Sequence, residues 1–343
     1  MFSSATKTPG QGVKSAYLQL VGLIKHHLVG KIDLKINQKS KSDISHYQTI
    51  DPKFFLSTFL PSRGIKVASV HFLPQTIKES LNLPAPVFFA FSKYIIAFYK
   101  RMDALVVVNP NFIAPLVALG VDSKKITYIP NFVSPDDFFK QRKQTIQENY
   151  RRLHLKPQAF TILGVGQIQT RKGVDDFITL AKKNPHLQFI WAGGFSFGRL
   201  TKGYRHLKKK VDRPPKNLWF CGIVSKKTIN DLYNLADVFF LPSYDELFPM
   251  SILEAFNTST PVVARKLPAY KKIFSSWYLP AVNLKQMHTT LNNLKNSPLA
   301  FRSAQKKSQQ AAYFYRPGRL AWIWFNFYCQ QIKKYRQKIT GRI

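Results

Sequence analysis

The chain has 343 residues, 45% of them hydrophobic, so it is long and apolar enough for two globular domains, and wholesale disorder is excluded. Its 52 Lys and Arg against 17 Asp and Glu give a net charge of +35, and no acidic residue follows Glu254. A field of this strength attracts a polyanion, which leaves nucleic acid and an anionic bilayer as the candidate classes of partner.

Cysteine spacing and hydropathy exclude further classes of protein. Cys221 and Cys329 match no metal-binding spacing and no disulfide framework, which is typical of a reducing cytoplasm. No apolar run reaches the ~18 residues of a spanning helix, and the N-terminus has no charged segment followed by an apolar core. We therefore expect no transmembrane helix and no signal peptide, so that any contact with a membrane is peripheral, on its cytoplasmic face.

In the first half of the chain, predicted strands alternate with helical stretches. A glycine loop, Gly10-Gln-Gly12, stands where a first strand should end, and apolar strands follow at 67–72 and 105–108. His46 and His71 lie at strand ends, where a lone histidine is more often structural than catalytic. The alternation predicts a parallel sheet with helices on its faces.

The segment 84–102 combines aromatic residues with cations and predicts a helix. A core helix between two strands is one interpretation. The other is an interfacial helix whose aromatic face dips into the headgroup region while Lys and Arg extend to the phosphates. The C-terminal stretch 320–338 repeats this chemistry, and basic residues near an anionic surface contribute ~1 kcal/mol each. The candidate membrane contacts are Phe88, Phe91, Lys93, Lys100 and Arg101.

A proline-containing stretch, Pro130–Asp137, separates the two halves and leads into a polar, basic and helical segment at 140–156. The predicted domains are residues 1–135 and 136–316. In the second domain, strands at 160–165, 188–192 and 237–241 again alternate with helical patterns, which predicts a second parallel sheet.

Two glutamates, Glu246 and Glu254, follow the strand at 237–241. Seven residues separate them, and one of the seven is Pro249. Proline pre-sets the first turn of a helix, so Glu246 should lie on a loop and Glu254 one turn into a helix. The unpaired N–H groups of that turn are a seat for phosphate, and the two carboxylates can accept hydrogen bonds from a sugar and from a ribose. The alternative is an ordinary helix start whose acidic residues complement the helix dipole.

The string Pro242-Ser-Tyr-Asp-Glu246-Leu-Phe-Pro, followed by Leu253-Glu254-Ala255, resembles the signature of glycosyltransferase family 4. This resemblance implies the GT-B fold, an α/β architecture of two Rossmann-like domains with parallel sheets facing across a cleft, in which 317–343 packs back on the first domain. It also implies a retaining transferase that needs no metal and no cofactor, in which Glu246 contacts the donor sugar and Glu254 the ribose.

The same resemblance assigns roles to other residues. The loop 164–173 resembles the family's diphosphate loop, with Lys172 at the position of the family's lysine. Gln167 stands where the family usually has arginine, and our hypothesis is that Arg171 compensates, because a leaving diphosphate needs cationic help. His71 matches the histidine that contacts the donor sugar. The remaining candidates are Gly10, Gly12, Gly166, Phe248, Pro249, Met250, Ser251 and Ile252 for the donor, and His46 for the acceptor side of the cleft.

Sequence strings outside the family 4 signature resemble a narrower group of enzymes. Gly-Gln-Gly-Val-x-Ser-Ala-Tyr17 and Trp-Ala-Gly-Gly-Phe-Ser-Phe-Gly198 are similar to strings of the Gram-positive and mycoplasma enzymes that add a second hexose to α-glucosyl-diacylglycerol. Those enzymes make the dihexosyl glycolipid that also anchors lipoteichoic acid. The implied partners are a UDP-hexose, with galactose favoured over glucose, a glycolipid acceptor and an anionic membrane. A family 4 enzyme acting on a polysaccharide or a polyprenyl-linked sugar is the alternative. A nucleic-acid-binding protein is disfavoured because no binding module accompanies the charge.

Overall fold

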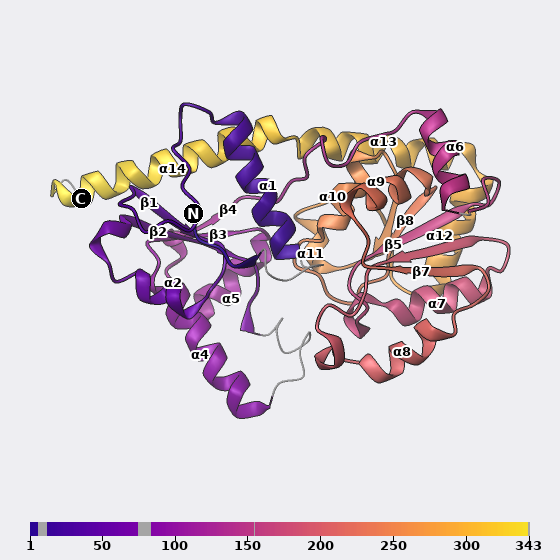
Figure 1. Cartoon of the computed structure of the whole chain (residues 1–343), viewed down its shortest axis with the longest axis horizontal. Coiled ribbons are helices and arrows are strands. Elements are labelled where there is room, and N and C mark those ends of the chain that lie inside the picture. Colours follow the sequence, from indigo (N-terminus) through magenta and orange to yellow (C-terminus); the bar gives the residue numbers. More distant parts are fainter. Residues whose placement is uncertain (6–11, 75–83, 154, 342–343) are drawn as a thin grey trace. The chain divides into compact units, whose positions relative to one another are not determined.

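The computed structural model describes residues 1–5, 12–74, 84–153 and 155–341 (Figure 1). Its contacts divide the chain into two compact units. The first unit is built from the described residues of Met1–Glu79 and Leu83–Phe132 together with Pro317–Ile343, and the second from Val133–Arg316. Each unit has its own parallel sheet, as the alternation of strands and helices in the sequence predicts.

The sheet of the first unit has the strand order β1-β2-β3-β4, and every neighbouring pair is parallel. Its strands are β1 (Ile44–Tyr47), β2 (Ile65–Val70), β3 (Ala104–Val107) and β4 (Ile126–Tyr128). Phe2 extends the sheet by one parallel bridge to Tyr47, so the short segment before the glycine loop pairs with β1. The helices of this unit are α1 (Gly12–His27), α2 (Pro52–Ser57), α4 (Ala85–Arg101), α5 (Ile113–Ala118) and α14 (Pro317–Ile339).

The C-terminal helix α14 belongs to the core of the first unit. It packs against α1 and β2 (Figure 1). Leu320, Trp324 and Phe327 lie on one face of α14, at the spacing of three and four residues that gives an amphipathic helix its apolar stripe. They share a hydrophobic cluster with Leu20 of α1 and Val67 of β2. Burying each large apolar side chain contributes about 1.5–3 kcal/mol, so α14 is part of the fold of this unit.

The second unit has the strand order β10-β9-β8-β5-β6-β7, again with all neighbours parallel. Its strands are β5 (Thr161–Val165), β6 (Gln188–Ala192), β7 (Leu218–Gly222), β8 (Val238–Leu241), β9 (Val262–Arg265) and β10 (Leu279–Ala281). The strand order reverses at β5, which pairs with β6 on one side and with β8 on the other. The carboxyl ends of β5 and β8 therefore flank a topological switch point, where open α/β sheets bind their ligands.

The helices of the second unit surround this sheet and lie over both of its faces (Figure 1). They are α6 (Lys143–Arg152), α7 (Val174–Lys183), α8 (Tyr204–Asp212), α9 (Lys226–Leu235), α10 (Met250–Asn257), α11 (Pro268–Lys271), α12 (Leu284–Asn296) and α13 (Pro298–Phe314). The predicted strands of both units lie within two residues of the observed ones, because each is a short apolar run ended by Gly, Pro, Asn or Ser.

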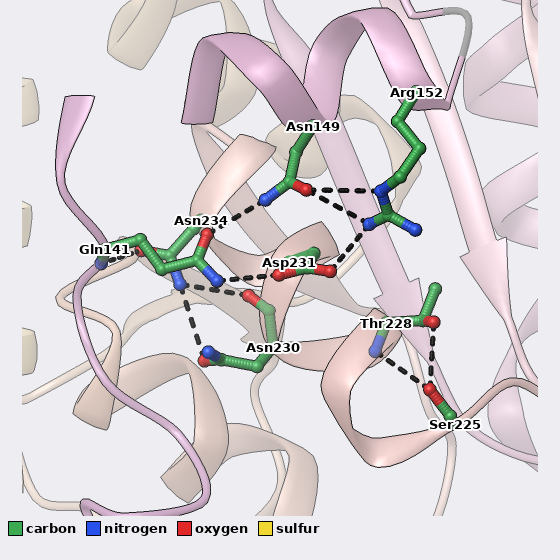
Figure 2. A network of polar contacts seen from close by, with 8 residues as sticks. All are labelled: Gln141, Asn149, Arg152, Ser225, Thr228, Asn230, Asp231 and Asn234. Carbon is green, nitrogen blue, oxygen red and sulfur yellow. Dashed lines mark hydrogen bonds and ion pairs between the residues drawn. The ribbon is translucent and has the colours of Figure 1, made fainter. Parts of the chain in front are cut away.

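A polar network around the buried Asp231 joins the beginning of the second unit to α9. Figure 2 shows Asp231 of α9 between two side chains from the preceding segment and α6: Gln141 Nε2 donates to one carboxylate oxygen over 2.6 Å, and Arg152 Nη2 reaches the other over 2.6 Å. The main-chain N–H of Gln141 donates to Asn234 over 2.8 Å. The polar stretch predicted to be helical thus forms α6, and its polar residues bind α9.

Candidate functional site

Glu246 lies on the loop between β8 and α10, where it is the centre of a buried charged cluster. Lys172 Nζ lies 2.5 Å from its Oε1 atom, and Arg171 Nη1 lies 3.6 Å from Oε2. The Ser243 hydroxyl donates to Oε1 over 2.7 Å. Only 5% of the Glu246 residue surface is exposed, so its charge is shielded from solvent and held by these partners.

A glycine explains how Lys172 reaches Glu246 across 74 residues of sequence. Gly173 has a φ of +69°, and a Cβ atom there would lie 2.3 Å from the main-chain oxygen of Pro242. Only glycine permits this approach. The main-chain N–H of Tyr244 also donates to the carbonyl of Arg171 over 2.8 Å. The loop before α7 therefore packs against the loop after β8, and both cations face the glutamate.

Opposite charges decide the ionisation of Glu246. Burial raises the pKa of this carboxyl, but Lys172 and Arg171 outweigh burial and hold the pKa below its usual value. For Lys172, burial is the larger influence and lowers its pKa, while Glu246 opposes the change. Arg171 Nη1 also donates to the carbonyl of Asp245 over 2.7 Å, and its Nε is buried without a partner among the described residues. The cluster thus combines a carboxylate acceptor with two cations.

Close main-chain packing builds the rest of this edge of the sheet. Gly193, which follows β6, has a φ of +138°, and a Cβ atom there would lie 1.9 Å from the carbonyl oxygen of Gly166. The N–H of Gly166 donates to Ala192, and the N–H of Gly193 donates to Gly222. The loops after β5, β6 and β7 are therefore joined at their carboxyl ends. The side-chain oxygen of Gln167 accepts from Gln169 Nε2 over 2.7 Å.

Glu254 lies inside α10, one turn after the helix begins at Met250. Its Oε2 atom accepts from the Tyr233 hydroxyl over 2.9 Å. Burial raises the pKa of Glu254 to about 7, against the smaller opposing effect of the Tyr233 hydrogen bond. Pro249 is the N-cap residue of α10, and no side chain of the described residues caps it. Phe248, Met250 and Ile252 are buried, so their side chains are not available to a ligand.

The two candidate histidines lie in the first unit, on neighbouring strands. His46 is buried on β1, and His71 follows β2 at the wall of a cavity of about 20 Å³. Gln48 joins them: its amide nitrogen lies 2.9 Å from Nε2 of His46, and its amide oxygen 3.1 Å from Nε2 of His71. Gly12 begins α1, whereas Gly10 lies outside the described residues.

Comparison with known proteins shows the family of this chain. A family model described as "Glycosyl transferases group 1" matches residues 146–311. The alpha-galactosylglucosyldiacylglycerol synthase of Streptococcus pneumoniae is 42% identical over 332 residues, which cover 96% of this chain and 89% of that protein. The chain belongs to the group 1 glycosyltransferases. A second relative of this glycosyltransferase, the processive diacylglycerol alpha-glucosyltransferase of Acholeplasma laidlawii, is 28% identical over 53% of the chain and 56% of its own length.

Solved structures share the fold of the glycosyltransferase. The HepE protein of Anabaena in complex with UDP-glucose superposes with a TM-score of 0.74 and 14% identity over 98% of each chain. The WaaG glycosyltransferase, which is involved in lipopolysaccharide biosynthesis, has a TM-score of 0.65 and 14% identity over 92% of this chain and 96% of its own. The prediction of an α/β protein of the GT-B class with two Rossmann-like units is confirmed.

The helix predicted at 84–102, for which a core position and a membrane contact were both possible, forms α4, and Ile95, Phe98 and Tyr99 of this helix are buried. Phe88 and Phe91 are half-buried, while Val87 and Phe89 beside them are exposed at 53% and 64%. The cations of this helix, Lys93, Lys100 and Arg101, are exposed. Across the parts of the chain that the structure describes, no helix is both long and apolar enough to cross a bilayer.

Four contacting residues have roles that sequence reasoning did not find. Ser243 and Tyr233 bond to the two glutamates, and Gln48 and Tyr328 bond to His46. The sequence spacing could have predicted the contact of Gln48 with His46, because Gln48 is two residues after His46 and residues two apart on a strand share a face. No sequence pattern predicts the contact of Tyr328, since Tyr328 lies 282 residues from His46.

Proposed function

We propose that this glycosyltransferase moves a hexose from a UDP-sugar to a membrane glycolipid, α-glucosyl-diacylglycerol, with galactose favoured over glucose. The observation that carries the proposal is the 42% identity to the pneumococcal alpha-galactosylglucosyldiacylglycerol synthase over nearly the whole chain. The UDP-glucose in the HepE structure supports a UDP-sugar as donor, because the two chains share one fold.

In this proposal the second unit binds the donor. Glu246 accepts hydrogen bonds from the hexose, and the adjacent Lys172 and Arg171 face the diphosphate. Glu254 holds the ribose, and the first turn of α10 donates its main-chain N–H groups to phosphate. Two buried cations at the leaving group supply the electrostatic help that a metal would otherwise give, which supports a reaction without a metal.

The proposed reaction retains the configuration of the hexose. The bond from the anomeric carbon to the UDP oxygen breaks as the acceptor hydroxyl attacks the same face, and the departing phosphate oxygen takes the acceptor's proton. The positive charge that develops on the sugar ring lies near Glu246, whose pKa is held low enough to keep it ionised. The carboxylate thus acts through its charge and its hydrogen bonds, with Lys172 holding it in place.

The proposed acceptor is a membrane lipid, and the exposed side chains of α4 suit a membrane surface. Val87 and Phe89 expose apolar surface, while Lys93 and Arg101 of the same helix are exposed cations. An amphipathic helix of this kind binds anionic bilayers through buried apolar area and charge together. We therefore assign the protein to the surface of an anionic membrane, as a peripheral enzyme.

A transfer assay tests the proposal. Purified protein is mixed with vesicles containing α-glucosyl-diacylglycerol, with and without phosphatidylglycerol, and with radiolabelled UDP-galactose or UDP-glucose. We expect label in a dihexosyl lipid, more from UDP-galactose, stimulated by the anionic lipid and unchanged by EDTA. The anomeric proton couplings of the product report retention. Label only in a polyprenyl-linked or polysaccharide acceptor would establish the alternative family 4 activity instead.

Flotation of a matched pair of variants with the same vesicles tests the membrane assignment. Val87→Ser with Phe89→Ser removes the exposed apolar surface of α4 but leaves its cations, and we expect weaker vesicle flotation. Leu200→Ser, which removes an exposed apolar side chain from the second unit, is the control. Equal flotation of both variants would contradict the role of α4.

A further inference from the structure

Four polar side chains form a continuous line of hydrogen bonds through the first unit: Tyr328, His46, Gln48 and His71, which we call the histidine line. Nδ1 of His46 lies 2.8 Å from the hydroxyl of Tyr328, and its Nε2 lies 2.9 Å from the amide nitrogen of Gln48. The amide oxygen of Gln48 lies 3.1 Å from Nε2 of His71. The line therefore runs from α14, through β1 and the residue after it, to the histidine that follows β2.

The Gln48 amide gives the histidine line a direction. An amide nitrogen only donates and an amide oxygen only accepts, so Nε2 of His46 is an acceptor and Nε2 of His71 is a donor. The Ser69 hydroxyl lies 2.9 Å from the same nitrogen, so it shares the single lone pair of Nε2 with the Gln48 amide. His46 thus carries its proton on Nδ1, facing Tyr328. His71 carries its proton on Nε2, which leaves the lone pair on Nδ1.

Burial keeps the histidine line uncharged. Burial lowers the pKa of His46 well below its usual value, and the N-terminal ammonium of Met1 and the neighbouring His71 lower it further. Burial also lowers the pKa of His71 to about 4 and raises the pKa of the Tyr328 phenol. The Met1 ammonium itself has its pKa lowered to about 6, chiefly by burial and then by Arg63. Near neutral pH the line therefore acts through the direction of its hydrogen bonds.

The line ends at the small cavity beside His71. Gln48, Ser69 and His71 line the cavity together with Trp324 of α14, and its volume of about 20 Å³ is enough for one water molecule. His46 and Gln48 are almost completely buried, whereas His71 is only half-buried. His71 is thus the member of the line that a substrate group can reach.

We propose that Tyr328, His46 and Gln48 are positioning residues that hold His71 in the one tautomer whose Nδ1 atom accepts from a sugar hydroxyl. This inference rests on the proposed function and on the role that the family resemblance implies for His71, a contact with the donor sugar. Tyr328, His46 and Gln48 do not touch the substrate. They act through the His71 ring, whose two nitrogens have opposite roles once one of them carries the proton. Because Tyr328 comes from α14, the C-terminal helix sets the hydrogen-bonding state of a histidine near the beginning of the chain.

Nitrogen NMR of ¹⁵N-histidine-labelled protein tests the tautomer directly. We expect His71 in the wild type to be protonated at Nε2 alone. Tyr328→Phe keeps the ring that packs on Trp324 but removes the hydroxyl, and it should give His71 signals of mixed tautomers. Tyr150→Phe removes the hydroxyl of a half-buried tyrosine, which donates to the carbonyl of Leu235 in the second unit, and is the matched control. A wild-type His71 protonated at Nδ1, or an unchanged His71 in Tyr328→Phe, overturns the inference.

Measurements of kcat and KM distinguish a positioning role of Tyr328 and Gln48 from a purely structural role. One lost hydrogen bond is worth about a fivefold change, so Tyr328→Phe should lower kcat about fivefold with KM for the UDP-sugar unchanged. Gln48→Met, which fills the same space without hydrogen bonds, should lower kcat more. Equal kcat values for Tyr328→Phe, Tyr150→Phe and the wild type would contradict the inference.

Gln48→Glu should restore the kcat that Gln48→Met loses. A carboxylate accepts from Nε2 of His71 as the amide does, so the tautomer should be kept and kcat at high pH restored relative to Gln48→Met. Its negative charge raises the pKa of His71, so the acid limb of the pH profile should move upward from about pH 4. An acid limb that does not move contradicts the link through Gln48. If the wild type transfers no hexose at all, the proposed function fails, while the NMR experiment still decides the inference.

Discussion

At the carboxyl end of the first sheet, the buried His46 and the half-buried His71 are neutral rings, whereas at the carboxyl end of the second sheet the buried Glu246 is paired as an ion with the cations Lys172 and Arg171. Burial is the largest influence on the pKa of His46, His71, Lys172 and Glu246. The charged groups near each residue decide whether it is neutral or ionised. His46 has only a second histidine and the N-terminal ammonium near it, which both favour the neutral ring, while Glu246 has two cations.

The comparison indicates a division of labour between the two edges. A neutral hydrogen-bonded group offers direction, because its donors and acceptors are fixed. An ion pair offers charge, which suits a substrate that carries a diphosphate. Under the proposed function, the charged edge suits a sugar nucleotide and the neutral edge suits a sugar hydroxyl. The following predictions test the charged edge, from the largest expected effect to the smallest.

The largest effect is expected from Glu246→Gln, which keeps the shape of the side chain and removes its charge. We expect kcat to fall on the order of 10²–10³-fold, the cost of losing a preorganised electrostatic contact at the reacting sugar. Steady-state transfer kinetics measure it, with the exposed Glu148→Gln on α6 as the control. If Glu246→Gln kept its kcat, the charged edge would be structural, and the contrast between the two edges would lose its functional meaning.

A smaller loss is expected from Arg171→Ala, because Arg171 is only the second cation beside Glu246. Hydrogen bonds to charged groups are worth about 1.5–3 kcal/mol, which corresponds to a loss of roughly 10- to 100-fold in kcat. The double variant Arg171→Ala with Gln167→Arg should regain part of this loss, since it restores an arginine at the usual position of the family. Arg199→Ala, on an exposed turn, is the control. Unchanged turnover in Arg171→Ala would refute the compensation by Arg171.

The smallest effect concerns pH, and it follows from the Glu254 pKa of about 7. Ribose hydroxyls donate to the ionised carboxylate, so binding lowers this pKa and releases a proton. The affinity for UDP-galactose should therefore rise with pH, at most about tenfold per unit below pH 7, and level off above it. Calorimetry in two buffers of different ionisation enthalpy counts the released proton. A flat profile, or the same profile in Glu254→Gln, would remove Glu254 from the ribose site.

The raised pKa of Glu254 also has a consequence for the protein without ligand. A carboxyl whose pKa is higher in the folded state than its ordinary value of 4.5 stabilises the fold most at low pH. This contribution decreases as the pH rises from about 4.5 to 7. Comparing the Tm of the wild type and Glu254→Gln across that interval isolates it from other titrating groups.

Local patterns predicted much of this protein, because they depend on residues that are close in sequence. The strand before Glu246 and the proline that begins α10 were readable from apolar runs and from the fixed φ of Pro249. The three-residue strands β4 and β10 were not, since such short runs carry no periodicity. The ion pair of Lys172 and Glu246 was also invisible as a contact, although both residues were named from a family resemblance.

The contacts that sequence reasoning missed are those made by tertiary packing. Tyr328 looks like one more aromatic residue in an amphipathic C-terminal helix, and only the docking of α14 on the first unit brings its hydroxyl to His46. Ser243 reaches Glu246 because the loop turns back on itself within three residues. Neither side chain differs in type or spacing from residues that only pack.

The position of α14 has a consequence for synthesis on the ribosome. The first unit needs Leu320 and Trp324 to complete its hydrophobic cluster, and these residues are translated after the whole of the second unit. The second unit can fold as it emerges, since its strands are contiguous from Val133 to Arg316. The first unit must wait for the last segment of the chain. A nascent chain that stalls before α14 would therefore contain a complete second unit and an incomplete first unit, in which His46 lacks its contact with the Tyr328 hydroxyl.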